Sequence, residues 1–134
     1  MYKEISIARA DGSEELTPLL ANAATPRRYK QIFHEDLLTL IANAEKKTEA
    51  GETIYSIDFL AELTFVMAMQ AKARDDSKIK LDKLNENSLI DWLEQYDGMS
   101  IENAANDILE VYLGNSKTES ETKKNRDEQS EKEG

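Results

Sequence analysis

The sequence contains no cysteine among its 134 residues. Disulfides, thiol catalysis and thiolate metal sites are therefore excluded together. It contains one histidine, His34, so a metal site built from several histidines is excluded as well. No run of about 18 apolar residues occurs, and the alternating start of the chain is unlike a signal peptide. We therefore expect a cytoplasmic protein with no membrane-spanning helix.

Glycine and proline are also scarce, with five and two copies. Long stretches of Ala, Leu, Glu, Lys and Ile with so few breakers favour helices. The hydrophobic content of 40% is enough for the modest core of one domain. The formal net charge of −10 opposes binding to nucleic acid and to anionic membranes. These features predict a small, acidic, mostly α-helical domain that binds another protein.

The first residues alternate between apolar and polar types. Ile5 and Ile7 fall on one side of residues 2–8, which predicts a short strand that ends at the turn pair Asp11-Gly12. A single strand cannot form a sheet, so it is either a frayed arm or an edge that pairs with another subunit. Residues 14–24 are predicted to be helical, with Pro18 near the first turn, from the spacing of Leu16, Leu19, Leu20 and Ala23.

Thr25 followed by Pro26 is a helix start signal, an N-cap hydroxyl before a proline in the first turn. Apolar residues then recur at helical spacing as far as Ala44, which predicts one long helix or two helices with a break near His34. The helical pattern ends in the polar residues 45–52, where Gly51 is the predicted stop.

The second half of the chain is predicted to be helical with short breaks. Its elements are a helix over residues 56–73, a charged loop with helical turns over 74–83, a helix capped by Asn87 or Ser88 and running to Tyr96, and a last helix that is capped by Ser100 and stopped by Gly114. Residues 115–134 hold no apolar residue, so they cannot offset an ordering cost of ~1–2 kcal/mol per residue. We therefore predict a helical domain over residues 1–114, with about four to six helices, and a disordered charged tail over 115–134.

No motif for catalysis or cofactor binding is present. His34, Glu35 and Asp36 are adjacent in sequence, so on a helix they point in different directions and cannot converge on a substrate. Glycine-rich phosphate loops, nucleophile elbows, HExxH and EF-hand patterns are missing. We predict a protein that is not an enzyme, with no catalytic, cofactor or metal residues.

Two features suggest partner binding. Arg27 and Arg28 begin the one basic cluster, at a predicted helix N-terminus where cations are mildly unfavourable. We expect them to form salt bridges within the fold or between subunits, and a phosphate site is the minor alternative. The helix over residues 56–73 has a narrow polar stripe that is interrupted by large apolar residues. Partner-binding candidates are therefore Phe65, Met69, Asp58, Glu62, Arg27 and Arg28.

That mixed stripe leaves two interpretations open. The helix could be a central one, buried nearly all round. Alternatively, Phe65 and Met69 could form an exposed patch that receives an amphipathic client helix, because a methionine thioether is flexible and polarisable.

The order of several segments resembles a known family. The segments are Pro26-Arg27-Arg28-Tyr29-Lys30-Gln31-Ile32-Phe33, Asp36-Leu37-Leu38, Leu63-Thr64-Phe65-Val66-Met67-Ala68, Leu89-Ile90-Asp91-Trp92-Leu93-Glu94-Gln95-Tyr96 and Lys123-Lys124-Asn125. Together they resemble the tail assembly chaperones of long, non-contractile-tailed phages and prophages of Gram-positive bacteria, over roughly residues 25–124. One departure is His34, where the family leads us to expect a glycine.

The resemblance implies a non-structural chaperone with a helical fold and no catalytic residues. Such a protein coats the tape-measure protein in the host cytoplasm, holds it soluble, self-associates along it and is absent from the mature virion. A programmed ribosomal frameshift in many members makes a longer form that recruits the tail-tube protein. Here the codons for Lys123-Lys124-Asn125 are the expected slippery site.

A second hypothesis rests on charge alone. An acidic helical adaptor or inhibitor could block a basic partner by charge mimicry. Ionic strength separates the two hypotheses, because charge mimicry weakens steeply as salt rises whereas apolar holding persists.

Overall fold

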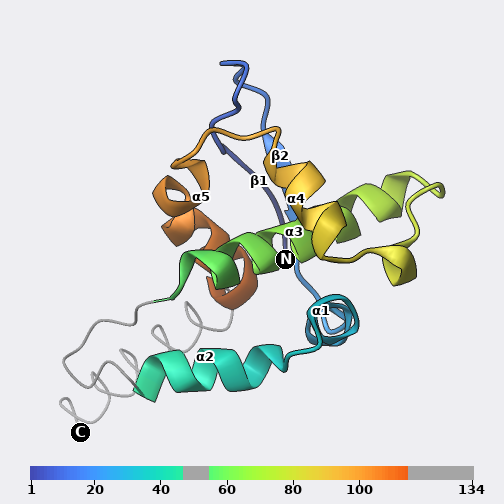
Figure 1. Ribbon diagram of the computed structural model, residues 1–134, viewed down its shortest axis with the longest axis vertical. Helices are drawn as coiled ribbons and strands as arrows, with labels where there is room; N and C mark the ends of the chain where they lie inside the picture. Colours follow the sequence, from blue (N-terminus) through green and yellow to red (C-terminus); the bar gives the residue numbers. More distant parts are fainter. Residues whose placement is uncertain (47–54, 115–134) are drawn as a thin grey trace, which may run out of the picture.

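The computed structural model describes residues 1–46 and 55–114, and these are mostly helical (Figure 1). The elements are β1 (Tyr2–Ile5), β2 (Thr17–Leu20), α1 (Thr25–Phe33), α2 (Leu37–Lys46), α3 (Ile57–Asp75), the 3-10 helix η1 (Leu81–Lys83), α4 (Glu86–Leu93) and α5 (Ser100–Asn103). After a turn at Ala104, residues 105–114 are helical again. The predicted helix stop at Gly51 and the predicted disordered tail over residues 115–134 lie outside the described residues.

The strand predicted at the N-terminus finds its partner within the chain. β1 pairs antiparallel with β2, with Tyr2 opposite Leu20. The helix predicted over residues 14–24 is therefore wrong in this part. Burial along β2 alternates, with Thr17 and Leu19 buried, as the two-residue period of a strand requires. Pro18 has no N–H to donate, and a strand in a two-stranded sheet can tolerate that.

The start of α1 differs from the prediction by one residue. Ala24 is the N-cap, and Thr25 is already helical. The Thr25 hydroxyl accepts hydrogen bonds from the Asn22 N–H at 3.0 Å and from Gln70 Nε2 at 2.9 Å, so it joins β2's end to α3 instead of capping α1. Pro26 stands in the first turn, as expected.

Two helices, and not one, occupy residues 25–46. α1 ends at Phe33, and His34 takes the left-handed conformation with φ = 61°, where its N–H donates to the Lys30 carbonyl at 2.8 Å. Asp36 then begins α2, because its carboxylate accepts from the Thr39 N–H at 3.0 Å. The break near His34 confirms the second of the two predicted alternatives.

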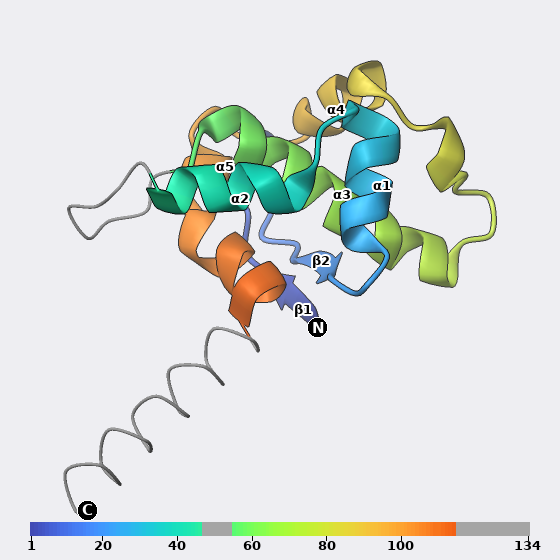
Figure 2. The same cartoon turned by 90° about the horizontal axis from the view of Figure 1, so that it is seen from below.

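α3 is the central helix, as one of the two interpretations predicted. It starts where Ser56 accepts from the Phe59 N–H at 3.1 Å. In Figure 1, α1 and α2 lie on one side of it and α4 and α5 on the other. β1 and β2 lie on the side of α3 opposite α4 (Figure 2), and β2 packs directly against α3. An apolar helix with such neighbours is buried nearly all round.

The apolar faces predicted for the last helices are confirmed, but the predicted N-cap residues are wrong. Asn85 is the N-cap of α4, where it forms a capping box with Ser88, so neither Asn87 nor Ser88 is the cap. The cap of α5 is Met99, and Ser100 is the first helical residue. The predicted apolar faces do line the core, and their most buried members are Trp92, Tyr96, Ile101, Ala104, Ile108 and Val111.

Candidate partner-binding surface

The predicted exposed patch of Phe65 and Met69 is wrong. The two residues are 1% and 7% exposed. The Phe65 ring lies 5.7 Å from the Trp92 ring of α4 and 6.4 Å from the Phe33 ring of α1, measured between centroids. α4 covers this part of the stripe on α3, so both residues belong to the core and cannot receive a partner in the folded state.

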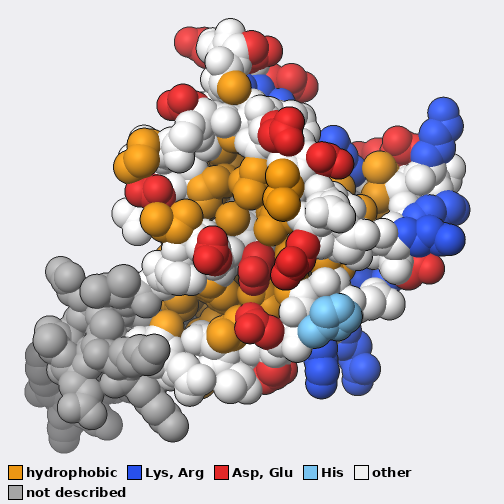
Figure 3. Space-filling model, viewed as in Figure 1, with side chains coloured by type: hydrophobic (Ala, Val, Ile, Leu, Met, Phe, Trp, Pro, Cys, Tyr) orange, Lys and Arg blue, Asp and Glu red, His pale blue; other side chains and the backbone are white. Residues whose placement is uncertain are grey.

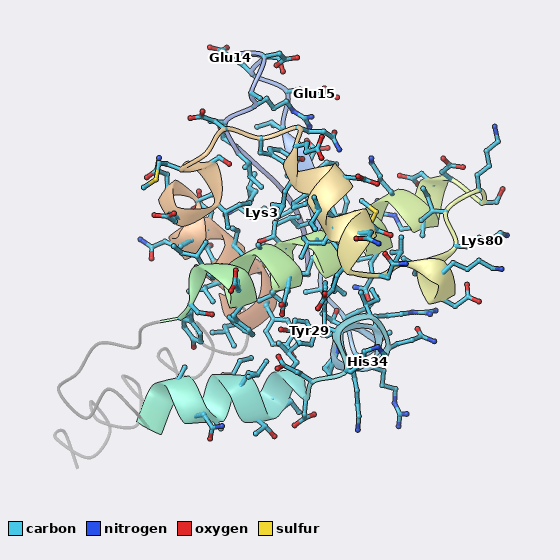
Figure 4. The ribbon with its side chains drawn as sticks, in the orientation of Figure 1. Lys3, Glu14, Glu15, Tyr29, His34 and Lys80 are labelled. Atoms are coloured by element: carbon cyan, nitrogen blue, oxygen red, sulfur yellow. The ribbon has the colours of Figure 1, made fainter. Side chains whose placement is uncertain are left out.

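Toward the start of α3, the same side of the helix is more exposed than at Phe65. Glu62 is half-buried here, and it accepts a hydrogen bond from the hydroxyl of Tyr29, which is fully buried. Figure 4 shows Tyr29 in the space between α3 and the α1–α2 pair. Asp58, four residues before Glu62 and therefore on the same face, is exposed.

Negative charge gathers around Glu62. Burial raises the pKa of its carboxyl, and the carboxylates of Glu35, Asp58 and Glu86 raise it further, whereas the hydrogen bond from Tyr29 lowers it. Burial and the same hydrogen bond to Glu62 hold the pKa of the Tyr29 phenol far above its ordinary value. Two surface ion pairs, Lys3–Glu110 and Arg74–Asp75, are formed by the described residues, so these four carboxylates have no basic partner there.

An apolar strip lies beside this acidic group. Ile57 and Ala61 are four residues apart and share one face of α3, next to the face of Asp58 and Glu62. Ile90 and Leu93, three residues apart, form a second apolar pair on α4, the helix whose Glu86 carboxylate acts on Glu62. Ile57 and Ile90 are 53% and 54% exposed, Leu93 is half-buried, and Ala61 is buried. In Figure 3, apolar side chains fill the space between α4 and α5, above a row of acidic side chains.

We call Ile57, Ala61, Ile90 and Leu93 the apolar strip, and its bordering carboxylates the acidic rim. The rim consists of Asp58 and Glu62 on α3 and of Glu86 and Glu94 on α4. Glu86 and Glu94 lie four residues before and after Ile90, so they flank its side chain along the helix. The strip therefore offers apolar contact to a partner and repels negative charge around it.

The basic cluster lies elsewhere. Arg27 is exposed, and Arg28 donates to Gln31 Oε1 at 3.0 Å from its Nη1 atom. Neither arginine forms an ion pair with a described residue, so the predicted salt bridge is not found within this part of the fold. Together with Lys30 and Gln31, the two arginines line an open pocket at the start of α1. The intersubunit role and the phosphate role of these arginines stay predictions.

Groups for catalysis do not converge in the described part of the chain. His34, Glu35 and Asp36 are all exposed, and the Asp36 carboxylate is bonded to Thr39. No cluster of three or more His, Asp or Glu side chains there could hold a metal ion. Within the same residues, no helix is long and apolar enough to cross a membrane.

Comparison with protein-family models, with curated proteins and with solved structures finds no match to this chain. The support for the candidate surface therefore comes from the geometry of this chain alone. Sequence reasoning named Asp58 and Glu62 but missed Ile57, Ile90 and Glu86. The sequence does contain one signal for Ile90. It follows Leu89, so the apolar face of α4 is wider than the part that packs against the core.

Proposed function

We propose that this chain is a tail assembly chaperone of a long, non-contractile-tailed phage or prophage. In this role it binds the tape-measure protein and keeps it soluble, without catalysis. The single observation that supports this best is the apolar strip, which is exposed on a strongly acidic molecule and is bordered by carboxylates without basic partners. A holding chaperone needs apolar surface for its client and like charge to keep the complex in solution.

The resemblance in motif order adds to that support, and His34 is consistent with it. The family leads us to expect a glycine at this position, and the backbone here has φ = 61°, a conformation that glycine adopts most readily. The departure at His34 therefore changes the side chain and not the local turn.

The proposal includes the partners of the family. The chaperone acts in the host cytoplasm, self-associates along its client and is left out of the finished virion. A longer form, made by ribosomal frameshifting near Lys123–Asn125, brings the tail-tube protein to the assembly. A tethered second domain would raise the local concentration of tube subunits at the client.

Co-expression tests the proposed function. The open reading frame for a very long helical protein next to this gene is expressed alone and together with the full chain. The proposal expects the long protein to be insoluble alone and to be recovered in a soluble complex with this chain. Aggregation of the long protein to the same extent in both cases would contradict it. The absence of such a reading frame, and of a tube-protein gene on the other side, would also contradict it.

The frameshift is tested on the gene. Slippage needs codons for Lys123-Lys124-Asn125 that read A-AAA-AAC or A-AAA-AAT, because both tRNAs then pair again after moving back one base. Expression of the natural gene should give a minor longer product, and synonymous recoding of these three residues should remove it. A −1 frame that closes within a few codons would show that the longer form does not arise here.

A second candidate function is supported by the acidic rim itself. An adaptor or inhibitor that mimics a polyanion would present carboxylates like Asp58 and Glu86 to a basic partner. Its binding would fall steeply between low and high salt, since exposed charges are screened within ~10 Å at 0.1 M ionic strength. Client complexes that survive at high salt favour the chaperone, and complexes that dissociate favour the mimic.

A further inference from the structure

The apolar strip is short and lies along two helices, with charge of one sign around it. Ile57 and Ile90 are each more than half exposed, although both belong to well-formed helices. An exposed isoleucine alone needs no explanation. Here one exposed isoleucine lies on each of two helices, and the carboxylates Asp58 and Glu86 of these helices both act on Glu62, so the two apolar pairs share one acidic surrounding.

The acidic rim selects among partners for this surface. A polyanion is repelled by Asp58, Glu62, Glu86 and Glu94, which excludes nucleic acid. An uncharged apolar helix would cover the strip but would leave the mutual repulsion of the carboxylates in place. A helix with lysine or arginine on both flanks of its apolar face covers the strip and also neutralises the rim.

The described residues of a second copy do not present such a helix. Among the described helices, cationic side chains gather in the first turns of α1, at Arg27, Arg28 and Lys30. Two more, Lys72 and Arg74, lie in the last turn of α3. The apolar residues of α1 are already in the core, where Tyr29, Ile32 and Phe33 are 0%, 3% and 7% exposed. The large apolar residues of α3 after Ile57 are buried as well, so the described part of a folded copy has no free basic amphipathic face to place on the strip.

From this charge complementarity we infer that the apolar strip, Ile57, Ala61, Ile90 and Leu93, is the docking site for a basic amphipathic helix of the client. The helix lays apolar residues spaced three and four apart against the strip and directs lysine or arginine to the acidic rim. This inference rests on the proposed function, because that function makes the partner a segment of the tape-measure protein.

Two synthetic helical peptides of equal apolar content test the docking site directly. One carries lysine on both flanks of its apolar face, and the other carries glutamate at the same positions. Binding to the full chain is followed by titration calorimetry and by the fluorescence of Trp92, the one tryptophan, which lies on α4 next to Leu93. We expect the lysine peptide to bind at least about tenfold more tightly than the glutamate peptide. Equal affinity for the two peptides would overturn the inference.

Variants of the strip have a matched control on another face. Ile90→Asp should weaken the lysine peptide by about tenfold or more, whereas Leu38→Asp, at a residue on α2 that is 58% exposed, should leave its affinity unchanged. Ile57→Asp is a second strip variant, and an acidic residue in the first turn of α3 favours the helix, so folding is retained. Equal affinity in all three variants would overturn the inference, as would a dimer of the wild-type chain that Ile90→Asp dissociates.

The neutral variant Asp58→Asn with Glu86→Gln tests the rim separately. It should weaken the lysine peptide and reduce the salt dependence of its binding, since fewer charges are screened. An unchanged salt dependence would mean that the rim does not contact the partner, and the inference would fail.

Co-expression with the tape-measure protein distinguishes failure of the site from failure of the function. If Ile90→Asp keeps the client as soluble as the wild type does, the chaperone role stands and the docking site is wrong. If the wild type does not hold the client but binds the lysine peptide through the strip, the docking site stands and the proposed function is wrong.

Discussion

The Tyr29–Glu62 pair shows how one residue can hold a charge that its surroundings oppose. Burial and three neighbouring carboxylates raise the pKa of Glu62, so the folded state favours its protonated form. The Tyr29 hydroxyl donates to this carboxyl and has no other hydrogen-bond partner among the described residues. Because Tyr29 is fully buried, loss of that acceptor would leave a phenol unsatisfied in the core.

Two substitutions at Glu62 should therefore have opposite effects at pH 7. Glu62→Gln keeps an oxygen that accepts from Tyr29 and removes the opposed charge, so the free energy of unfolding should stay equal or rise. Glu62→Ala removes the acceptor and should lower it by about 1–3 kcal/mol. Urea unfolding measures both, and a stability loss for Gln as large as that for Ala would contradict this account.

The pH dependence of the same pair has a definite sign. Since the folded pKa of Glu62 lies above its unfolded value, its contribution to stability is complete below the ordinary Glu pKa of about 4.3 and is lost as pH rises through the raised value. Glu62→Gln should show a smaller loss over that range than the wild type. Unfolding titrations at pH 4 to 7 compare the two chains, and parallel curves would contradict the assignment.

His34 has an unfavourable backbone conformation, and its exposed side chain does not offset the cost. Its φ of 61° is the left-handed region, which costs a non-glycine residue about 1–2 kcal/mol. The side chain is exposed, so little packing is lost on its removal. We expect His34→Gly to raise the free energy of unfolding by about 0.5–1 kcal/mol after the greater freedom of glycine in the unfolded chain is counted. His34→Val should lower it, and thermal unfolding of the two variants tests the order.

At the scale of elements, α3 is joined to α1 and α4 by aromatic contacts. The Phe65 ring contacts rings of both α1 and α4, and the ring of Phe59 lies 6.2 Å from that of Tyr29. Phe65→Ala should therefore cost about 3–5 kcal/mol and make the domain unfold near room temperature or below. Ile57→Ala on the same helix, at a residue that is 53% exposed, is the control and should cost far less.

The outcome for Phe65→Ala also decides between core and surface. A variant that retains the melting temperature of the wild type would mean that Phe65 is not in the core. Circular dichroism during heating provides the measurement for both Phe65→Ala and Ile57→Ala.

Helices could be predicted from the sequence where a local signal was strong. The start of α3 follows from Ser56 before a long apolar segment, and the apolar faces of α4 and of residues 105–114 follow from their spacing. β2 was missed because Leu16, Leu19 and Leu20 fit a helical period, and only pairing with β1 makes them a strand. Caps were misplaced by one to three residues, because several polar residues precede each helix.

The candidate surface could be predicted only in part, for a related reason. The wheel of α3 groups Phe65 with Asp58 and Glu62 correctly, but it does not contain α4, whose Trp92 ring packs against Phe65, while Asp58 stays exposed and Glu62 half-buried. Whether a residue on a mixed stripe is exposed depends on the tertiary packing of another helix. Ile90 is exposed for the same reason, since the core side of α4 is the side that bears Trp92.

At the scale of the whole molecule, charge acts against the compact state. Residues 115–134 contain five basic and six acidic residues, so residues 1–114 carry −9 of the total charge of −10. The two ion pairs of the described residues join exposed side chains, and pairs of that kind contribute little. Like charges held close together therefore repel more in the folded domain than in the unfolded chain.

Salt should consequently stabilise this domain. Raising NaCl from about 0.02 M to 0.5 M shortens the screening length from tens of ångströms to a few, and we expect the melting temperature to rise by several degrees, which is about 1 kcal/mol for a domain of this size. The Asp58→Asn and Glu86→Gln double variant should start from a higher melting temperature and gain less from salt, because part of the repulsion is already gone. If the melting temperature of the variant rises with salt as much as that of the wild type, the cause is the general strengthening of apolar burial by salt and not the screening of these charges. A melting temperature that falls with salt would mean that attractive pairs, and not repulsion, dominate the electrostatics of the fold.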